Sequence, residues 1–195
     1  MHTTVINIFG APGVGKSVLA ARLYASLKMH GLKTEMVTEY AKELTWDNRI
    51  DLIKNNHALL LAEQKRRIDL LMGKVQFIVT DSPFPLVTIY GKHEGEWFRR
   101  YAMDVFGRYP NFNIYIPLTP GRAYEQEGRK ETPAEAIQID RELEDLMIGN
   151  HPYLPGFATH YEWSHGADDL GWLVQKVVRD YEALWGEHVT GEVQG

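Results

Sequence analysis

The chain has 195 residues, a formal net charge of −5 at pH 7 and no cysteine. The lack of cysteine excludes disulfides and thiolate metal sites, and the acidic balance argues against a broadly basic nucleic-acid-binding surface. Apolar residues make up 44% and charged residues 24% of the sequence, which is typical of a soluble globular protein, and the length predicts one domain.

The first predicted strand covers residues 5–9, where an apolar run is interrupted only by Asn7. It begins too near the N-terminus to leave room for a signal peptide, and no apolar run approaches the length of a membrane span. We therefore expect an intracellular, soluble protein without a membrane partner. A helix is predicted after residue 17, because apolar residues recur there at helical spacing, and Gly31 is placed to end it. These apolar residues are Val18, Leu19, Ala21, Leu23, Leu27 and Met29.

Between this strand and this helix lies the sequence GAPGVGKS, residues 10–17. It matches the phosphate-binding pattern Gly-x-x-x-x-Gly-Lys-Ser, and it has the strand and helix flanks that the pattern requires. We expect the backbone N–H groups of the loop to surround phosphates, Lys16 to reach the β- and γ-phosphates, and Ser17 to bind magnesium. The implied cofactors are ATP and Mg²⁺. The predicted nucleotide-binding residues of the loop are Gly10, Ala11, Pro12, Gly13, Val14, Gly15, Lys16 and Ser17.

Predicted strands and helices alternate along the rest of the chain. Further strands are predicted at residues 33–37, 75–80, 113–118 and 158–164, and a long helix covers much of residues 50–72 and ends at Gly73. The last helix has an apolar stripe from Leu170 to Trp185, with Asp168 or Asp169 near its start and Gly186 after it. This alternation predicts an α/β fold with a doubly wound parallel sheet, in which ligands bind at the carboxyl ends of the strands.

Two carboxylates follow predicted strands and become candidate catalytic residues. Asp81 directly follows the third strand, where an acid beside the phosphate loop would bind magnesium, although Asp before Ser-Pro is also a common turn starter. Glu39 follows the second strand and is a candidate base for an acceptor hydroxyl, with Tyr40 and Lys42 nearby, or a carboxylate that starts a helix.

The long helix carries polar residues inside an apolar stripe. Trp46, His57 and Gln64 fall on the same side of the helical wheel as its leucines and isoleucines. A buried Gln64 must have its amide satisfied, either by neighbouring backbone or by the edge of a nucleobase-like ligand, so Gln64 joins Tyr40 as a predicted substrate-binding residue. The basic run at residues 65–67 is typical of a solvated helix face.

A polar stretch after the fourth strand contains three cations, Arg122, Arg129 and Lys130. We predict that they close over ATP, with Arg122 binding the nucleotide and Arg129 stabilising charge on the transferred phosphoryl group. The alternative is solvated loop charge. The next helix begins at a capping box, in which Thr132 caps and Glu135 lies three residues later.

The order of these motifs resembles that of the small P-loop kinases, a group that includes the ribosylnicotinamide kinase domain of bacterial NAD regulators. The motifs are the loop at residues 10–17, TEYAKE, VTDSP and YEQEGR. The organisation is also similar to thymidylate-kinase-like proteins of bacterial viruses, including kinases that phosphorylate 5-hydroxymethyluracil in viral DNA. The resemblance implies the P-loop nucleoside triphosphate hydrolase/kinase fold, with one kinase domain over residues 1–186, a lid at about 119–132 and a flexible tail at 187–195.

One departure from this group concerns the acceptor. Ordinary deoxynucleoside kinases carry an acidic-Arg-Ser motif after the third strand, whereas Asp81 is followed here by Ser82 and Pro83. This argues against a nucleoside 5′-hydroxyl as the acceptor. It also leaves a second phosphate-binding arginine to be chosen among three candidates, Arg99, Arg100 and Arg108.

From the residues and the resemblance we expect an ATP- and Mg²⁺-dependent kinase that phosphorylates an alcohol group of a nucleoside-type acceptor. The first hypothesis for that group is the hydroxymethyl of 5-hydroxymethyl-deoxyuridine in viral DNA, a thymidine modification. The alternatives are a kinase of ribosylnicotinamide or another free nucleoside or nucleotide and, in another class, an NTPase switch or assembly factor. We expect a cytoplasmic protein, located in the host cytoplasm if it is viral.

Overall fold

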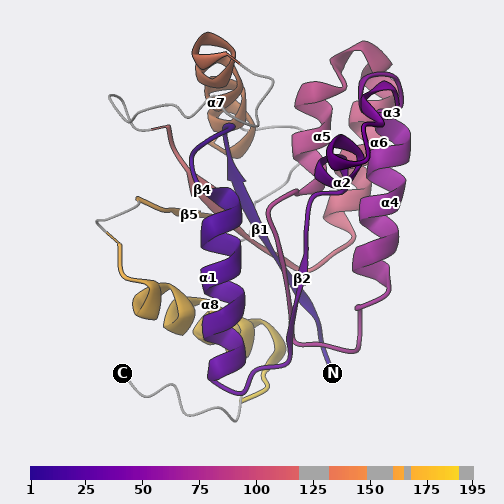
Figure 1. Cartoon of the computed structure of the whole chain (residues 1–195). Coiled ribbons are helices and arrows are strands. Elements are labelled where there is room, and N and C mark those ends of the chain that lie inside the picture. The colour runs from indigo at the N-terminus through magenta and orange to yellow at the C-terminus, as the bar shows by residue number, and fades with distance from the viewer. Residues whose placement is uncertain (119–131, 149–159, 165–167, 189–195) are drawn as a thin grey trace.

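The computed structural model describes residues 1–118, 132–148, 160–164 and 168–188. Within these residues, five parallel strands form one sheet in the order β2-β3-β1-β4-β5 (Figure 1). The strands are β1 (Thr4–Gly10), β2 (Thr34–Val37), β3 (Phe77–Thr80), β4 (Asn111–Ile116) and β5 (His160–Glu162). The doubly wound parallel sheet expected from the sequence is therefore confirmed.

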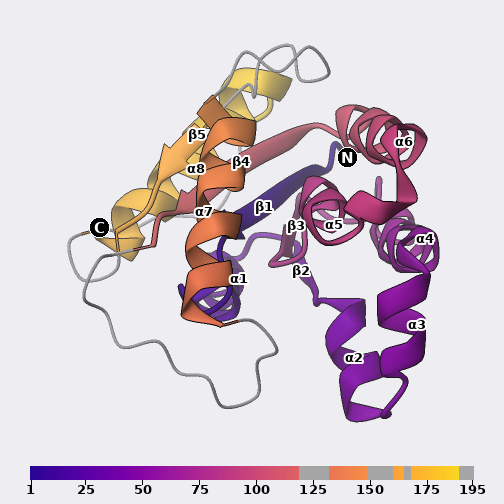
Figure 2. The same cartoon turned by 90° about the horizontal axis from the view of Figure 1, so that it is seen from above.

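Helices cover both faces of this sheet. On one face α1 packs along β1, β2 and β3 and also contacts α8, whereas α4, α5 and α6 contact one another on the other side (Figure 2). Figure 2 also shows α2 and α3 projecting away from the sheet. The described helices are α1 (Lys16–Met29), α2 (Tyr40–Trp46), α3 (Ile50–Asn55), α4 (His57–Asp69), α5 (Phe84–Tyr90), α6 (Glu96–Gly107), α7 (Pro133–Ile148) and α8 (Leu170–Trp185), with a short 3₁₀ helix, η1 (Lys92–Glu94).

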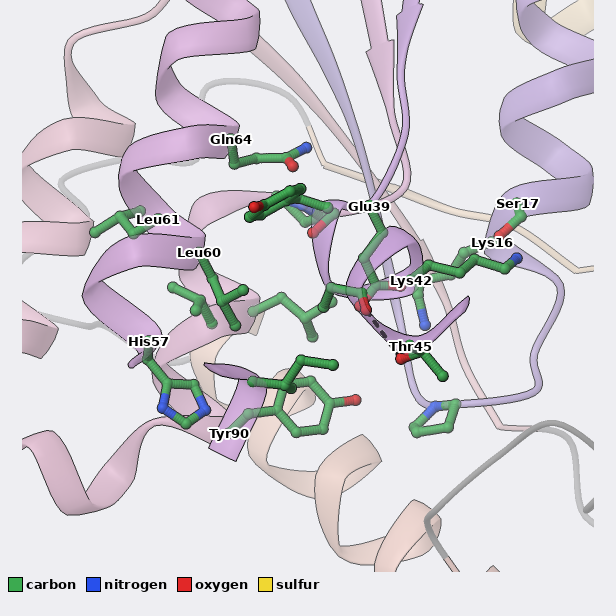
Figure 3. A pocket seen from close by; sticks show the side chains of 18 of the residues that line it. Lys16, Ser17, Glu39, Lys42, Thr45, His57, Leu60, Leu61, Gln64 and Tyr90 are labelled. Atoms are coloured by element: carbon green, nitrogen blue, oxygen red, sulfur yellow. Dashed lines mark hydrogen bonds between the residues drawn. The ribbon is translucent and has the colours of Figure 1, made fainter. Parts of the chain in front are cut away.

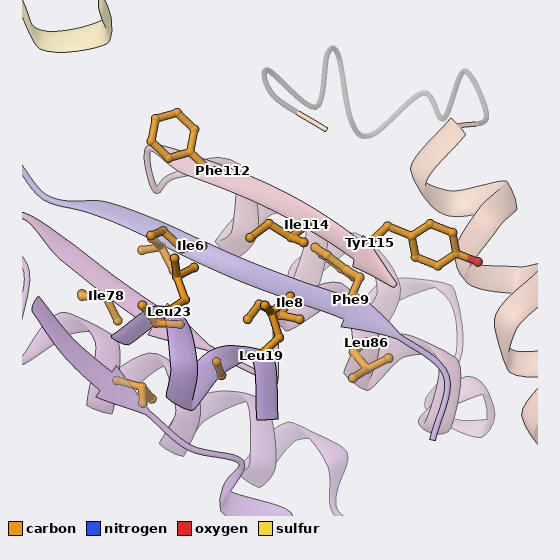
Figure 4. Packing of buried hydrophobic residues seen from close by; sticks show 14 of the residues in the cluster. Ile6, Ile8, Phe9, Leu19, Leu23, Ile78, Leu86, Phe112, Ile114 and Tyr115 are labelled. Atoms are coloured by element: carbon orange, nitrogen blue, oxygen red, sulfur yellow. The ribbon is translucent and has the colours of Figure 1, made fainter. Parts of the chain in front are cut away.

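The core lies on both sides of β1, the central strand, which is buried along its whole length. Successive side chains of a strand point to opposite faces, so Ile6 and Ile8 face Leu19 and Leu23 of α1 (Figure 4). Phe9 faces the other way, and its ring meets the edge of the Phe106 ring at 6.2 Å between centroids. Burial on both faces explains why the sequence of β1 is a nearly continuous apolar run.

The one polar interruption of that run has a partner in the neighbouring strand. Asn7 and Asn113 occupy the same register position in β1 and β4, and the Asn7 Nδ2 donates to the Asn113 Oδ1 at 3.1 Å. The Asn113 amide in turn donates to the Asn111 Oδ1 at 2.8 Å. Both buried amides are thereby hydrogen-bonded, which removes most of the cost of placing them in the core.

Several boundaries differ from the sequence predictions. The long helix predicted over residues 50–72 is two helices, because the chain breaks at Asn56, whose side chain caps α4 by accepting from the Leu59 N–H at 3.0 Å. β3 begins at Phe77 rather than at residue 75, since its pairing with β1 and β2 starts there. β4 begins and ends two residues earlier than predicted. β5 is described from residue 160, and the preceding part of the prediction lies outside the described residues.

The predicted helix ends are better reproduced. Thr132 and Glu135 form the reciprocal capping box, with the Glu135 N–H donating to the Thr132 hydroxyl at 3.3 Å and the Thr132 N–H donating to the Glu135 carboxylate at 2.7 Å. Asp169 caps α8 by accepting from the Gly171 N–H at 2.9 Å, and Gly186 ends the helix with a φ of 64°. Of the predicted tail, residues 189–195 lie outside the described residues.

The close packing under the glycine-rich loop can be tested with one methyl group. A Cβ at Gly10 would lie 2.7 Å from the Ile116 carbonyl oxygen and 2.6 Å from the Val14 Cγ2, at a φ of 150° that only glycine adopts readily. We expect Gly10→Ala to lower the free energy of unfolding by about 2–4 kcal/mol, as strained and overpacked buried sites do.

Gly31→Ala is the matched control for this substitution. Gly31 also has a positive φ, of 77°, but a Cβ there would meet nothing within 4 Å. We expect Gly31→Ala to lower the free energy of unfolding only by the cost of placing alanine in this backbone conformation, about 1 kcal/mol. Urea denaturation of both variants measures the difference, and equal losses of stability would contradict the proposed close packing at Gly10.

Candidate functional site

The loop at residues 10–17 connects the carboxyl end of β1 to the first turn of α1. Gly13 and Gly15 have φ values of 89° and 99°, so both need the left-handed conformation that glycine allows. α1 begins at Lys16 with neither a side-chain cap nor an acidic residue in its first turn. Its N-terminal N–H groups and the positive end of its dipole therefore face the loop without competition from an acidic residue of the first turn itself, which suits a bound anion.

The residues of the loop divide into two sets. Pro12, Gly13, Gly15, Lys16 and Ser17 line a pocket at the surface. Ala11 and Val14 are buried beneath the loop and pack into the core, as Gly10 does at the end of β1, so these three support the loop rather than line the pocket.

Lys16 lies over the loop that precedes it. Its Nζ donates to the carbonyl oxygens of Gly10 and Ala11 at 2.9 and 3.0 Å, which holds the ammonium group close to the loop backbone. A lysine in this position places a positive charge where the loop N–H groups would bind phosphate oxygens.

Ser17 and Asp81 meet although they are far apart in the sequence. The Ser17 hydroxyl donates to the Asp81 Oδ2 at 2.5 Å, because β1 and β3 are neighbouring parallel strands whose carboxyl ends lie side by side. Asp81 is only 4% exposed, and its Oδ1 has no hydrogen-bond partner among the described residues. A hydroxyl and a buried carboxylate with an unused oxygen are ligands that Mg²⁺ prefers, so the pair fits the predicted magnesium site.

The pocket extends from the phosphate loop to the helices on the other side of the site. Its volume is about 1090 Å³, and Figure 3 shows Lys16 and Ser17 at one side and the α4 residues His57, Leu60, Leu61 and Gln64 at the other. α2 and α3 supply further walls. The last wall is α5 and the turn before it, which supply Ser82, Pro83, Phe84, Leu86, Val87 and Tyr90.

Glu39 lies between these two sides, at the point where β2 leads into α2 (Figure 3). It occupies the N-cap position of α2, but its side chain makes no capping hydrogen bond. No capping contact therefore supports the alternative prediction that Glu39 is a carboxylate that starts a helix. Half-buried, on the wall of the pocket, the carboxylate is placed where a substrate group could reach it.

Tyr40 also lines the pocket, and it is held by an arginine of α4. The Arg67 guanidinium lies 4.9 Å from the centroid of the Tyr40 ring, and it donates two hydrogen bonds to the Glu43 carboxylate and one to Glu63. These contacts tie α2 to α4. The two hydrogen bonds from Arg66 and the one from Arg67 lower the pKa of Glu63 to about 2, so this carboxylate stays charged at neutral pH.

The basic residues at 65–67 therefore do not all lie on a solvent-exposed helix face. Lys65 pairs with Asp69 and Arg66 pairs with Glu63 at the surface, as the sequence predicts. Arg67 is only 20% exposed and connects two helices. The sequence carried no local signal for this contact, because Glu43 belongs to a different helix.

Gln64 is buried, as its place in the apolar stripe predicts, and it lines the pocket. Its Nε2 donates to the Thr80 hydroxyl at 3.2 Å, so a neighbouring side chain rather than backbone satisfies one end of the amide. Its Oε1 is buried and has no hydrogen-bond partner among the described residues. Trp46, by contrast, belongs to α2 and is 80% exposed, so the prediction that it shares one helical stripe with Gln64 is wrong.

The predicted lid residues Arg122, Arg129 and Lys130 lie outside the described residues. None of the three candidates for a second phosphate-binding arginine, Arg99, Arg100 and Arg108, is among the pocket-lining residues of the described chain. The sequence predictions did not include α5, which forms one wall of the pocket. Phe84, Val87 and Tyr90 recur at helical spacing, and this signal would have predicted an apolar helix face.

Among the described helices, none is long and apolar enough to span a membrane. No curated protein is significantly similar in sequence to this chain. One solved structure shows the same fold at low sequence identity. NadR protein in complex with NR is 14% identical with a TM-score of 0.66, over 97% of this chain and 53% of that one, so this chain spans about half of the NadR chain.

Two other solved structures align with this chain over almost the whole length of both partners in each comparison. APE1195 is 16% identical with a TM-score of 0.47, over 94% of this chain and 97% of that one. A mutant of the APS kinase CysC from Mycobacterium tuberculosis is 15% identical with a TM-score of 0.47, over 93% and 98%. Residues 5–161 match a family model described as an AAA domain. The fold is that of a P-loop nucleoside triphosphate hydrolase or kinase, and the chain belongs to the AAA domain family.

Proposed function

We propose that the protein is an ATP- and Mg²⁺-dependent kinase that transfers the γ-phosphate to a hydroxyl of a nucleoside-type acceptor. The observation that carries the proposal is one continuous pocket, with the phosphate loop and Ser17, which bonds to Asp81, at one side, a mainly apolar wall at the other side, and Glu39 between them. A nucleotide and a second substrate would then meet near Glu39.

The two sides of the pocket suit different parts of the substrates. The loop N–H groups and Lys16 would bind the phosphates of ATP, and Ser17 and Asp81 would hold Mg²⁺. When bound, the ion neutralises charge on the phosphate oxygens. The opposite wall offers Leu60, Leu61, Phe84 and Tyr90 for contact with a base. The Oε1 of Gln64, which no described residue hydrogen-bonds, can accept from a base N–H.

The proposed step is an in-line transfer that Glu39 assists. The acceptor hydroxyl oxygen forms a bond to the γ-phosphorus, and the bond from that phosphorus to the β,γ-bridging oxygen breaks, so that ADP leaves. The hydroxyl proton passes to the Glu39 carboxylate and from there to water. Arg122 and Arg129 remain the proposed lid cations for this step.

For the acceptor, a free nucleoside is favoured over a base within DNA. The cationic side chains among the described pocket-lining residues are Lys16, Lys42 and Lys54, with no arginine, which is a small set for binding a DNA backbone as well as ATP. NadR, the structural neighbour with a TM-score of 0.66, holds NR, and ribosylnicotinamide is therefore the first free acceptor to test. The hydroxymethyl group of 5-hydroxymethyl-deoxyuridine in DNA remains the alternative acceptor.

An NTPase switch is the competing function of another class. A switch needs the phosphate loop and the magnesium-binding residues Ser17 and Asp81. It does not need a binding region for a second substrate beside them. The size and apolar wall of the pocket therefore favour transfer to a second substrate over hydrolysis.

The magnesium assignment predicts the behaviour of Asp81→Asn. The amide keeps the shape of the side chain but removes the charge that holds a divalent ion, so we expect the Mg²⁺ concentration for half-maximal ATP turnover to rise by about tenfold or more. Asp104→Asn, an exposed change on α6, is the control. An unchanged magnesium profile in folded Asp81→Asn protein would leave Asp81 as a turn residue only.

The base assignment predicts a different result for Glu39→Gln. Loss of a general base slows transfer by about 10²- to 10⁴-fold, so kcat should fall by that factor while the Kd for ATP stays nearly constant. Glu35→Gln on β2, the strand just before Glu39, is the matched control, since Glu35 pairs with Lys28 at the surface. Loss of ATP binding instead would place Glu39 in the magnesium site, and full activity with every acceptor would exclude both roles.

A further inference from the structure

Two pocket-lining histidines, His57 and His93, form a cluster with Glu94 that the proposed transfer does not use. His57 is the first residue of α4, and His93 and Glu94 lie on η1. Their possible ligand atoms all lie within 4.8 Å of one another. Figure 3 shows His57 on the opposite side of the pocket from Lys16 and Ser17, so this cluster is separate from the magnesium pair.

The buried histidine in this cluster has an unsatisfied ring nitrogen. His57 is only 4% exposed, and its Nδ1 has no hydrogen-bond partner among the described residues. The nearest carboxylate oxygen, the Glu94 Oε1, lies 3.7 Å from Nδ1 and accepts instead from the His57 backbone N–H at 3.1 Å. A buried polar atom left without a partner costs free energy, which a ligand at this position would recover.

The neighbouring residues hold His57 and η1 together. The His57 and His93 rings lie 4.9 Å apart at an interplanar angle of 74°. A Cβ at Gly91, just before η1, would lie 2.9 Å from both the His57 Cγ and the Phe98 Cε1, so the backbone there packs directly against the imidazole. The start of η1 is thus fixed at the His57 ring, while the exposed His93 side chain is able to rotate.

The donor set identifies the kind of ion that would fit. Two imidazoles and one carboxylate suit Zn²⁺ and similar transition metals, whereas Mg²⁺ prefers oxygen ligands. Burial and the neighbouring His93 lower the pKa of His57, which favours the neutral ring that metals bind. Zn²⁺ bonds of about 2.1 Å place tetrahedral ligand atoms about 3.4 Å apart, so a small rotation of His93 and Glu94 would close the site.

We propose that His57, His93 and Glu94 bind one Zn²⁺ or similar divalent transition-metal ion. Three protein ligands leave a fourth position for water or a substrate atom, and His57 and His93 both line the pocket. The ion joins η1 to the start of α4 and closes this side of the pocket.

The test is direct metal binding by the full chain, without an affinity tag, after removal of metals with a chelator. We expect one equivalent of Zn²⁺ to bind in the absence of ATP, and Co²⁺ to give the visible absorption of a tetrahedral site. His93→Gln and Glu94→Gln should each weaken Zn²⁺ binding by about tenfold or more, since even changes beyond the direct ligands cost 10- to 100-fold. Both residues lie at or near the surface, so the variants should fold, and circular dichroism checks this.

His188→Gln and Glu96→Gln are the matched controls, because His188 is 97% exposed on its side chain and neither residue belongs to the cluster. They should bind Zn²⁺ like the unchanged protein. The proposal is overturned if no stoichiometric binding occurs, or if the control variants weaken binding as much as the cluster variants. Because the assay contains no ATP, its outcome is independent of the proposed kinase function.

Discussion

The parallel pairing of β1 with β3 places the Ser17 hydroxyl 2.5 Å from the Asp81 carboxylate, and the organisation of the site depends on this contact. Two residues 64 positions apart in the sequence become one polar pair at the carboxyl edge of the sheet. The burial of Asp81 leaves its second oxygen without a partner among the described residues, which is costly in a protein interior unless an ion occupies that position. In the proposed function, the loop would hold the nucleotide phosphates beside the same edge.

The remaining parts of the site are positioned from the other side of the pocket. Arg67 joins α4 to α2 through Glu43 and covers one face of the Tyr40 ring, so the segment that carries Glu39 is held against α4. Gln64 joins α4 to the end of β3 through Thr80, one residue before Asp81. The α4 side of the pocket and the side near the phosphate loop are therefore connected by polar side-chain contacts as well as by the core.

The structure of the loop half of the pocket could be predicted from the sequence because its determinants are local. A strand, eight residues of pattern and a helix follow one another directly, and Asp81 follows a short apolar strand that topology brings beside them. The half of the pocket around α4 could not be predicted in the same way. Trp46 ends α2 and is separated from α4 by the breaks at residues 47–49 and at Asn56, and Arg67 finds its partner on another helix. The hydrogen bond from the His57 backbone N–H to the Glu94 carboxylate likewise joins residues that are 37 positions apart, on either side of α5.

The central claim is that one pocket holds ATP at the loop and a nucleoside-type hydroxyl near Glu39. The most direct measurement is transfer of labelled γ-phosphate from ATP to a panel of ribosylnicotinamide, other free nucleosides, mononucleotides, ordinary DNA and DNA containing 5-hydroxymethyluracil, with Lys16→Ala protein as the blank. A kinase transfers label to one class of acceptor, releases little phosphate to water without it, and loses the activity in Lys16→Ala. Release of phosphate to water at a rate that no acceptor changes would contradict the claim and favour an NTPase switch.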